Sequence, residues 1–92
     1  MSDAWYVYIL RCADNSLYTG VATDVKRRLE EHNNGKSRYT ANRGPWKMVY
    51  LEKMPDKRTA LIRERQLKRC NSNYIKWLIK QEPNIVDRST HR

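Results

Sequence analysis

A tyrosine, an arginine and a histidine are spaced so that all three could reach one phosphate group. Tyr18 opens the triplet Tyr-Thr-Gly that ends at Gly20, and Arg28 and His32 follow it. In a helix, Arg28 and His32 would be one turn apart and would lie on the same side. A phenol, a guanidinium and an imidazole can together bind a phosphate and move a proton. The spacing therefore suggests nuclease chemistry.

Glu64 could add a metal ion to this group. Its neighbours three and four residues away form a mostly apolar helical stripe: Ala60, Leu61, Leu67 and Lys68. An acid on a core-facing stripe is costly to bury unless it is paired or bound to a cation. One interpretation is a salt bridge to Arg63, Lys68 or a strand residue. The other is a ligand for a single Mg²⁺ or Mn²⁺, since Mg²⁺ can bind through one carboxylate, water and substrate phosphate oxygens.

His32 and Arg28 also allow two interpretations. His32 ends an apolar helical stripe with Val25 and Leu29, where a histidine can simply pack or cap the helix. Arg28 favours function, because its planar guanidinium suits a phosphate and its charge would be out of place on a core-facing stripe. We therefore expect this pair at the edge of a cleft.

Tyr8 and Tyr18 lie in segments with the composition of strands, where aromatic residues usually serve packing. An odd number of loop residues, or a bulge, would place both on one face of the hairpin, and an even number would separate them. Gly20 near the end of the second strand indicates a bulge or the close approach of a backbone or ligand. We interpret it as a place where the backbone leaves room for DNA.

The pattern of apolar residues, turns and caps predicts an α+β chain of order β-β-α-β-α-α. The expected segments are strands over 5–10 and 17–21, a helix from Val25 to the stop at 33–35, a basic loop over 36–45, a strand over 46–51, a helix from an Asp56 cap to Arg69, and a helix over 74–80. We expect one domain over residues 1–82 and a polar tail over 83–92.

The charge of the chain predicts a polyanionic partner. Nineteen Lys and Arg against ten Asp and Glu leave a formal charge of +9 over 92 residues. Clustered cations supply sequence-independent attraction to phosphates, so we expect DNA and leave RNA open. The predicted contact residues are Lys26, Arg27, Lys36, Arg38, Arg43, Lys47 and Lys68.

Other partners and locations are less favoured. The apolar run over residues 5–10 is too short for a signal segment or a membrane span, so we expect a cytoplasmic protein. Cys12 and Cys70 are far apart without zinc spacing, and we expect reduced thiols. Nothing indicates a small-molecule cofactor, and the oligomeric state stays open.

Taken in order, these residues resemble the GIY-YIG endonuclease motifs. The matching residues are Tyr6-Val7-Tyr8, Tyr18-Thr19-Gly20, Arg28, His32 and Glu64. The resemblance covers residues 5–80 and the length resembles small stand-alone bacterial members. It implies a three-stranded antiparallel sheet flanked by helices and divalent-metal-dependent cleavage of DNA phosphodiester bonds with low sequence specificity, as in DNA repair or recombination.

The resemblance also implies roles for individual residues. Tyr8 and Tyr18 correspond to the two motif tyrosines, either of which could be the base, and Gly20 to the motif glycine. Arg28 corresponds to the phosphate-contacting arginine, His32 to the helix histidine, and Glu64 to the metal ligand.

Two features depart from the family pattern. Tyr6 replaces the first glycine, and the asparagine often found after the glutamate helix has no clear counterpart among Asn71, Asn73 and Asn84. The second departure bears on catalytic strength, so the alternative function is a non-catalytic nucleic-acid-binding module of the same fold. A third alternative is a protein-binding role with Trp46, Tyr74 and Trp77 as contact residues.

Overall fold

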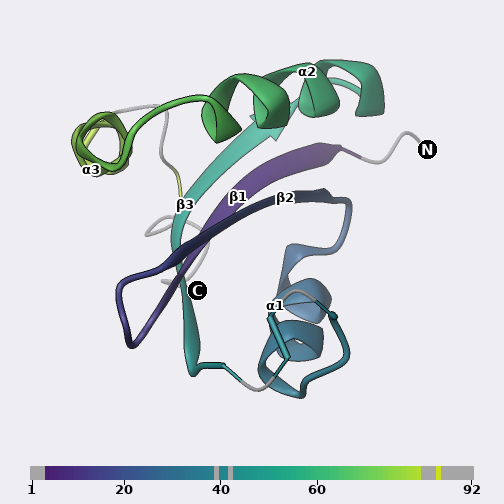
Figure 1. Cartoon of the computed structure of the whole chain (residues 1–92). Coiled ribbons are helices and arrows are strands. Elements are labelled where there is room, and N and C mark those ends of the chain that lie inside the picture. The colour runs from purple at the N-terminus through teal and green to yellow at the C-terminus, as the bar shows by residue number, and fades with distance from the viewer. Residues whose placement is uncertain (1–3, 39, 42, 82–84, 86–92) are drawn as a thin grey trace.

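The computed structural model describes residues 4–38, 40, 41, 43–81 and 85. Its elements follow the predicted order and are β1 (Trp5–Cys12), β2 (Leu17–Ala22), α1 (Val25–Asn33), β3 (Trp46–Met54), α2 (Lys57–Lys68) and α3 (Ser72–Ile79) (Figure 1). The strands form one antiparallel sheet in the order β2-β1-β3. The predicted fold class is therefore confirmed.

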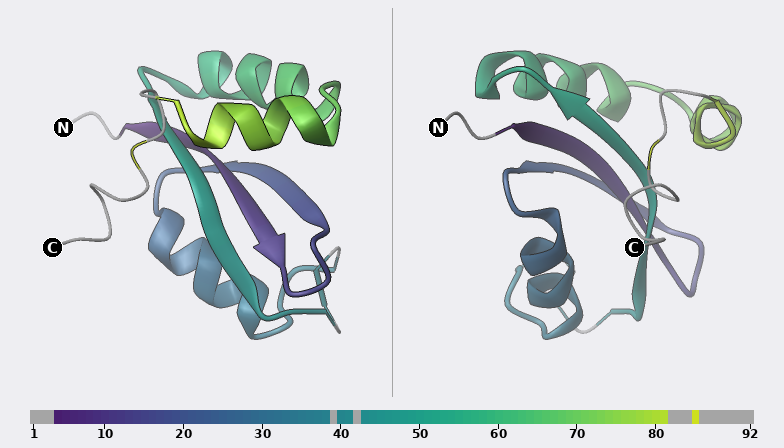
Figure 2. Two further views of the ribbon diagram at one scale, coloured as in Figure 1. Left: turned by 90° about the vertical axis from the view of Figure 1, so that its left-hand side faces the viewer. Right: turned by 180° about the vertical axis from the view of Figure 1, so that it is seen from behind.

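The central strand β1 is buried on both of its faces, which explains its unbroken apolar sequence. Val7 and Ile9 point to the face that packs against α2 and α3, whereas Tyr8 and Leu10 point to the face that packs against α1. The helices accordingly lie in separate layers, with α1 on one side of the sheet and α2 and α3 on the other (Figure 2). The tyrosines of the two motif triplets, Tyr6, Tyr8 and Tyr18, thus belong to the α1 layer.

Each helix begins at a side chain that accepts a backbone N–H of its first turn. Asp24 accepts from the N–H of Arg27 at 3.1 Å, and Asp56 accepts from the N–H of Thr59 at 2.8 Å. Asn71 caps α3 in the same way, so this helix begins at Ser72 rather than at the expected position 74. β1 and β3 also run further than expected, to Cys12 and Met54.

The structure describes part of the predicted C-terminal tail and both cysteines. Of the predicted tail, the structure describes Ile85, whose N–H donates to the Leu51 carbonyl at 2.8 Å. The rest of residues 83–92 lies outside the described part of the chain, and the domain boundary stays a prediction. Cys12 and Cys70 are free thiols, buried and half-buried respectively.

Two further observations bear on possible partners. Trp46 is 3% exposed and its indole donates to the Thr40 carbonyl, so the idea that it contacts another protein is wrong. Within the described residues, no helix is long and apolar enough to cross a membrane.

Candidate active site

The register of β1 and β2 brings the two motif tyrosines to the same face of the sheet. Tyr8 pairs with Gly20 and Leu10 pairs with Tyr18, so the side chains of Tyr8, Leu10 and Tyr18 point toward the α1 face of the sheet. The paired residues Arg11 and Leu17 enclose residues 12–16, an odd number. This is the arrangement that unites the tyrosines, and their ring centroids are 6.3 Å apart.

Gly20 makes room for a tyrosine of its own protein. A Cβ at this position would lie 2.5 Å from the Tyr8 Oη, 2.7 Å from its Cζ and 3.1 Å from Cε2 of Tyr18. Our interpretation that Gly20 leaves room for DNA is therefore wrong, because the phenol of Tyr8 occupies that space. The irregularity in the sheet also lies elsewhere, between Ile9 and Leu10 where β1 pairs with β3.

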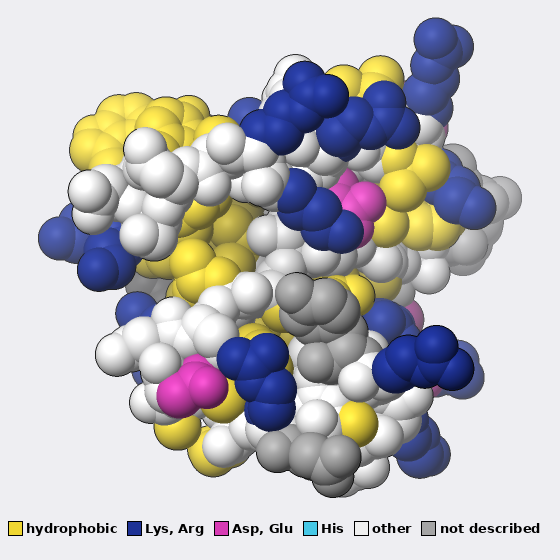
Figure 3. Space-filling model, in the orientation of Figure 1, with side chains coloured by type: hydrophobic (Ala, Val, Ile, Leu, Met, Phe, Trp, Pro, Cys, Tyr) yellow, Lys and Arg dark blue, Asp and Glu magenta, His cyan; other side chains and the backbone are white. Residues whose placement is uncertain are grey.

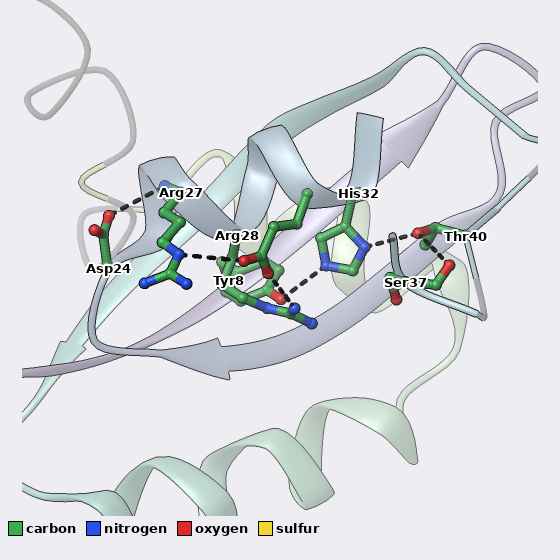
Figure 4. Close-up of polar contacts among 8 residues, drawn as sticks. Tyr8, Asp24, Arg27, Arg28, His32, Ser37 and Thr40 are labelled. Carbon is green, nitrogen blue, oxygen red and sulfur yellow. Dashed lines mark hydrogen bonds and ion pairs between the residues drawn. The ribbon is translucent and has the colours of Figure 1, made fainter. Parts of the chain in front are cut away.

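His32 is fully buried and is held at both of its ring nitrogens. Its Nε2 lies 3.0 Å from the Tyr8 Oη, and its Nδ1 lies 2.8 Å from the Oγ1 of Thr40 (Figure 4). The Thr40 hydroxyl in turn donates to the Ser37 carbonyl across 3.5 Å. Thr40 is itself fully buried, and sequence reasoning missed it because a threonine in a basic loop has no distinguishing pattern.

These contacts indicate which atoms carry the protons in the series of hydrogen bonds from Tyr8 through His32 and Thr40 to Ser37. When the Thr40 hydroxyl donates to the Ser37 carbonyl, its oxygen accepts a hydrogen bond from the Nδ1–H of His32, and Nε2 then accepts a hydrogen bond from the Tyr8 hydroxyl. Burial lowers the pKa of His32, which favours this neutral imidazole. Burial also raises the pKa of Tyr8 to about 12, so its phenol is protonated at neutral pH.

Arg28 is half-buried beside the Tyr8 hydroxyl, where Figure 4 shows its guanidinium. Its Nη1 donates to Glu31 at 2.7 Å, and Arg27 donates to the same carboxylate at 3.2 Å. Hydrogen bonding from Arg28 opposes part of the rise in the Tyr8 pKa. Glu31 was missed as a site residue, although its spacing of three and four residues from the two arginines is a detectable signal.

Tyr18 connects this buried group to an open pocket. Its ring lies 4.7 Å from that of His32, centroid to centroid, and the residue is half-buried. Tyr18 also lines a pocket of about 660 Å³ between β2 and the helices α2 and α3, together with Lys68. Tyr18 is therefore reachable from solvent, whereas Tyr8 and His32 are 0% exposed.

Glu64 comes to the site from α2, in the opposite layer of the fold. Its side chain is 19% exposed and pairs with Lys68 at 3.3 Å, which is one of the salt bridges considered from the sequence. Burial is the main cause that raises the pKa of Tyr8, and the charges of Tyr18 and Glu64 add to it, whereas the hydrogen bond and the charge of Arg28 lower it. The charge of Glu64 therefore bears on the pKa of Tyr8, and its ion-pair partner is Lys68 on its own helix.

The donor set around Glu64 fits one kind of metal ion. Among the residues that the structure describes, no three His, Cys, Asp or Glu side chains gather to hold an ion. A single carboxylate suits Mg²⁺, which keeps several waters and takes the rest of its ligands from substrate phosphates. The Lys68 ammonium is 56% exposed, so it can move aside when a cation replaces it.

The seven basic residues predicted to contact nucleic acid all have exposed side chains. They are distributed over α1, the following loop, β3 and α2, as Lys26, Arg27, Lys36, Arg38, Arg43, Lys47 and Lys68. Arg43 is held in place, because it lies 5.5 Å from the centroid of the Trp46 ring and 3.4 Å from the Asp14 carboxylate. Their role in binding stays a prediction.

Of the asparagines considered for the missing family position, Asn71 has a structural use in the cap of α3. Asn73 is an exposed residue of that helix, and Asn84 lies outside the described residues. The chain therefore offers Glu64 and Lys68, rather than an asparagine, at the α2 side of the site.

Comparison with known proteins gives consistent matches over nearly the whole chain. A model of the GIY-YIG catalytic domain matches residues 4–76. A UPF0213 protein of Syntrophus aciditrophicus is 45% identical over 80 residues, which cover 85% of this chain and 92% of that protein. The UPF0213 protein CPE1444 of Clostridium perfringens is 48% identical over 69 residues, which cover 74% of each.

Two solved structures are similar in fold. The solution NMR structure of the UPF0213 protein BH0048 from Bacillus halodurans has a TM-score of 0.58 and 36% identity, and covers 95% of this chain and 94% of that one. The solution NMR structure of the protein EF2693 from E. faecalis has a TM-score of 0.58 and 30% identity, and covers 88% and 92%.

Proposed function

We propose an endonuclease function from one premise: the chain belongs to the GIY-YIG catalytic domain family, which is a family of nucleases. The proposed activity is hydrolysis of DNA phosphodiester bonds with a single Mg²⁺ or Mn²⁺ and with low sequence specificity. The observation that carries the proposal is the convergence of Tyr8, Tyr18, Arg28 and His32 between the sheet and α1.

We assign roles to the four side chains by whether solvent can reach them. Tyr18 and Arg28 have accessible surface, so they would touch the substrate: Arg28 would stabilise negative charge on the phosphate, and Tyr18 would orient the attacking water. Tyr8 and His32 are buried behind them and would act as positioning residues. The sequence left open which of the two tyrosines acts on the attacking water. Its exposure favours Tyr18 for this role.

Glu64 would hold the metal ion. When bound, such an ion supplies Lewis-acid stabilisation of the phosphate and lowers the pKa of a coordinated water. The Glu64 carboxylate must first exchange its ion pair with Lys68, whose ammonium is then free to pair with a substrate phosphate.

Nicking of supercoiled plasmid DNA with Mg²⁺ or Mn²⁺ tests the proposal. We expect Arg28→Gln and Glu64→Gln each to lower the nicking rate by on the order of a hundredfold or more, as for loss of other groups that stabilise a transition state. Glu30→Gln is the matched control, because it removes a carboxylate from the exposed face of α1 and should leave the rate unchanged.

The outcomes separate the enzyme from the binding module. Nicking that survives both substitutions would reject the proposed site. An absence of cleavage on duplex, branched and single-stranded DNA, with salt-sensitive binding retained, would reject the enzyme and favour the non-catalytic module.

A further inference from the structure

Two aromatic side chains of α3 lie exposed on the surface. Tyr74 is 41% exposed and Trp77 is 55% exposed, and their rings pack against each other with centroids 5.5 Å apart and planes tilted by 37°. We propose that this aromatic pair stacks on unpaired bases of a nucleic-acid strand whose backbone enters the site at Tyr18. The inference rests on the proposed nuclease function and adds the class of substrate to it.

The exposure of the pair is not a by-product of helix packing. Ile75 and Leu78 hold α3 on the fold and are 4% and 3% exposed; Ile75 lies nearly opposite Trp77 on the helix, and Leu78 lies about a quarter turn from it. α3 cannot turn to bury Trp77 without exposing these two residues. The aromatic side chains therefore face solvent, while the apolar face of α3 is packed against the rest of the fold.

The charges around the pair select an anionic partner. From Lys68 to Gln81 the chain carries no Asp or Glu, and it carries four cations: Lys68, Arg69, Lys76 and Lys80. All four are exposed. A partner must then offer negative charge and flat apolar faces together. Single-stranded nucleic acid offers both, because phosphates alternate with bases whose faces are open.

Other partners match only part of this surface. A duplex presents phosphates but hides the faces of its bases in the stack, so the aromatic rings would have nothing to cover. An acidic protein segment would match the cations. Its aliphatic side chains, however, would gain less from contact with the open ring face of Trp77 than a stacked base does. The combination of rings and cations thus favours unpaired bases.

The position of α3 connects the pair to the candidate active site. The pocket of about 660 Å³ that Tyr18 lines at β2 is bounded on the α3 side by Ser72 and Ile75, with Lys68 between them. Figure 3 shows the hydrophobic area over α3 and the cations along α2 on one face of the molecule. The pocket at Tyr18 and the aromatic pair therefore both border α3.

Binding measured without divalent metal tests the inference separately from cleavage. The probes are a fluorescent oligothymidine and a blunt-ended duplex without a loop that has the same number of phosphates, titrated in EDTA. We expect Trp77→Ala to weaken oligothymidine binding by on the order of tenfold, the usual effect of removing one stacking ring. Trp77→Phe should stay within about threefold of the parent chain, and duplex binding should not change.

The control variant is Ile62→Ala, which removes another exposed apolar side chain, 46% exposed, from α2. It should change neither affinity. The dependence of oligothymidine affinity on salt should keep its slope in Trp77→Ala, because stacking releases no counterions. Circular dichroism of each variant checks that α3 remains folded.

Three results would overturn the inference. They are an unchanged oligothymidine affinity in Trp77→Ala, an equal loss on the oligothymidine and the duplex, and a self-association in sedimentation that Trp77→Ala abolishes while oligothymidine affinity stays the same. Because no step needs metal or turnover, a chain that fails to nick plasmid DNA but shows the expected loss would reject the nuclease and retain the stacking surface.

Discussion

At the scale of single residues, the candidate site depends on small residues that leave space for buried side chains or hold them in place. Gly20 has no side chain because Tyr8 occupies its space, and Thr40 contributes one hydroxyl that fixes the ring of His32. Both act through Tyr8 and His32, which are buried. The partly exposed side chains of Arg28 and Tyr18 are therefore supported by contacts of buried residues that solvent does not reach.

Gly20→Ala should destabilise the fold even though alanine usually stabilises a strand relative to glycine. The new Cβ would lie 2.5 Å from the Tyr8 Oη, so the ring must shift, at a cost of about 1–3 kcal/mol typical of overpacking. Urea unfolding measures the change. Gly35→Asn is the control, since Gly35 has open space and a φ of +75° that asparagine tolerates. A stabilised Gly20→Ala chain would contradict the contact.

Thr40→Val should leave the Nδ1–H of His32 without an acceptor in the interior. We expect a loss of about 1–3 kcal/mol in the free energy of unfolding, the cost of an unsatisfied buried donor. Thr40→Ser keeps the hydroxyl and should recover most of it. Imidazole ¹⁵N shifts should report the Nδ1–H tautomer in the parent and in Thr40→Ser. A parent spectrum with the proton on Nε2 would refute the assignment.

His32 should make the fold lose stability as the pH falls. Burial, with the nearby Arg28 charge, lowers its pKa in the folded state, and the Glu31 charge opposes this only in part. The unfolded chain then binds the proton first, near pH 6.5, so stability is full above that pH and declines below it until the folded pKa is reached. The slope cannot exceed about 1.4 kcal/mol per pH unit for this group.

The measurement pairs an NMR titration of His32 with urea unfolding between pH 7.5 and 5.5. We expect a His32 pKa below 6.5 and a smaller decline in His32→Asn than in the parent chain. A pKa above 6.5 in the folded protein would reverse the sign and reject the neutral imidazole.

At the scale of elements, α1 carries two of the predicted catalytic residues although it is only one short helix. Arg28 and His32 both project from α1, and the carboxylate of Asp24 closes the first turn by accepting from Arg27. A helix of this length gains most of its stability from its cap and its contacts with the sheet. The cap of α1 therefore positions the guanidinium as well as starting the helix.

Asp24→Ala should lower the free energy of unfolding by about 1 kcal/mol, the typical value of an N-cap. It should also reduce nicking, because the turn that carries Arg28 frays. Asp24→Ser retains a capping oxygen and should restore both properties. Thermal unfolding and the plasmid assay measure them, and a loss of nicking that Asp24→Ser does not restore would indicate that the Asp24 charge itself acts in the reaction.

At the scale of the whole molecule, the excess of cations sets the affinity for nucleic acid. The formal charge of +9 is distributed around the fold, and the cations predicted to contact the substrate are exposed. Such contacts release counterions, so affinity must fall as salt rises. A substrate bound mainly through such contacts would be selected by its backbone and shape more than by its sequence.

Lys36→Gln should reduce the slope of log affinity against log salt by about one, because one phosphate contact is lost. Lys53→Gln, an exposed cation of β3 outside the predicted contact set, is the control and should leave the slope unchanged. Fluorescence anisotropy at several salt concentrations measures both slopes. Equal slopes in Lys36→Gln and the parent chain would remove Lys36 from the interface.

The sequence by itself was enough for the order of elements and for the candidate residues at the β2 edge. Strand composition, capping residues and helical spacing are local properties, so β1, β2 and the Asp56 cap were predictable. The pairing of Arg28 and His32 on one helix face was predictable for the same reason. Element ends were less so, because Asn71 could equally have broken a helix or capped one.

Only the tertiary structure decided what each residue touches. Gly20 faces Tyr8, and His32 meets Thr40. The exposure of Trp77 and the burial of Trp46 likewise had no signal in residue type. Contacts of this kind depend on strand register and on how layers pack, which join residues far apart in the chain and leave no local pattern.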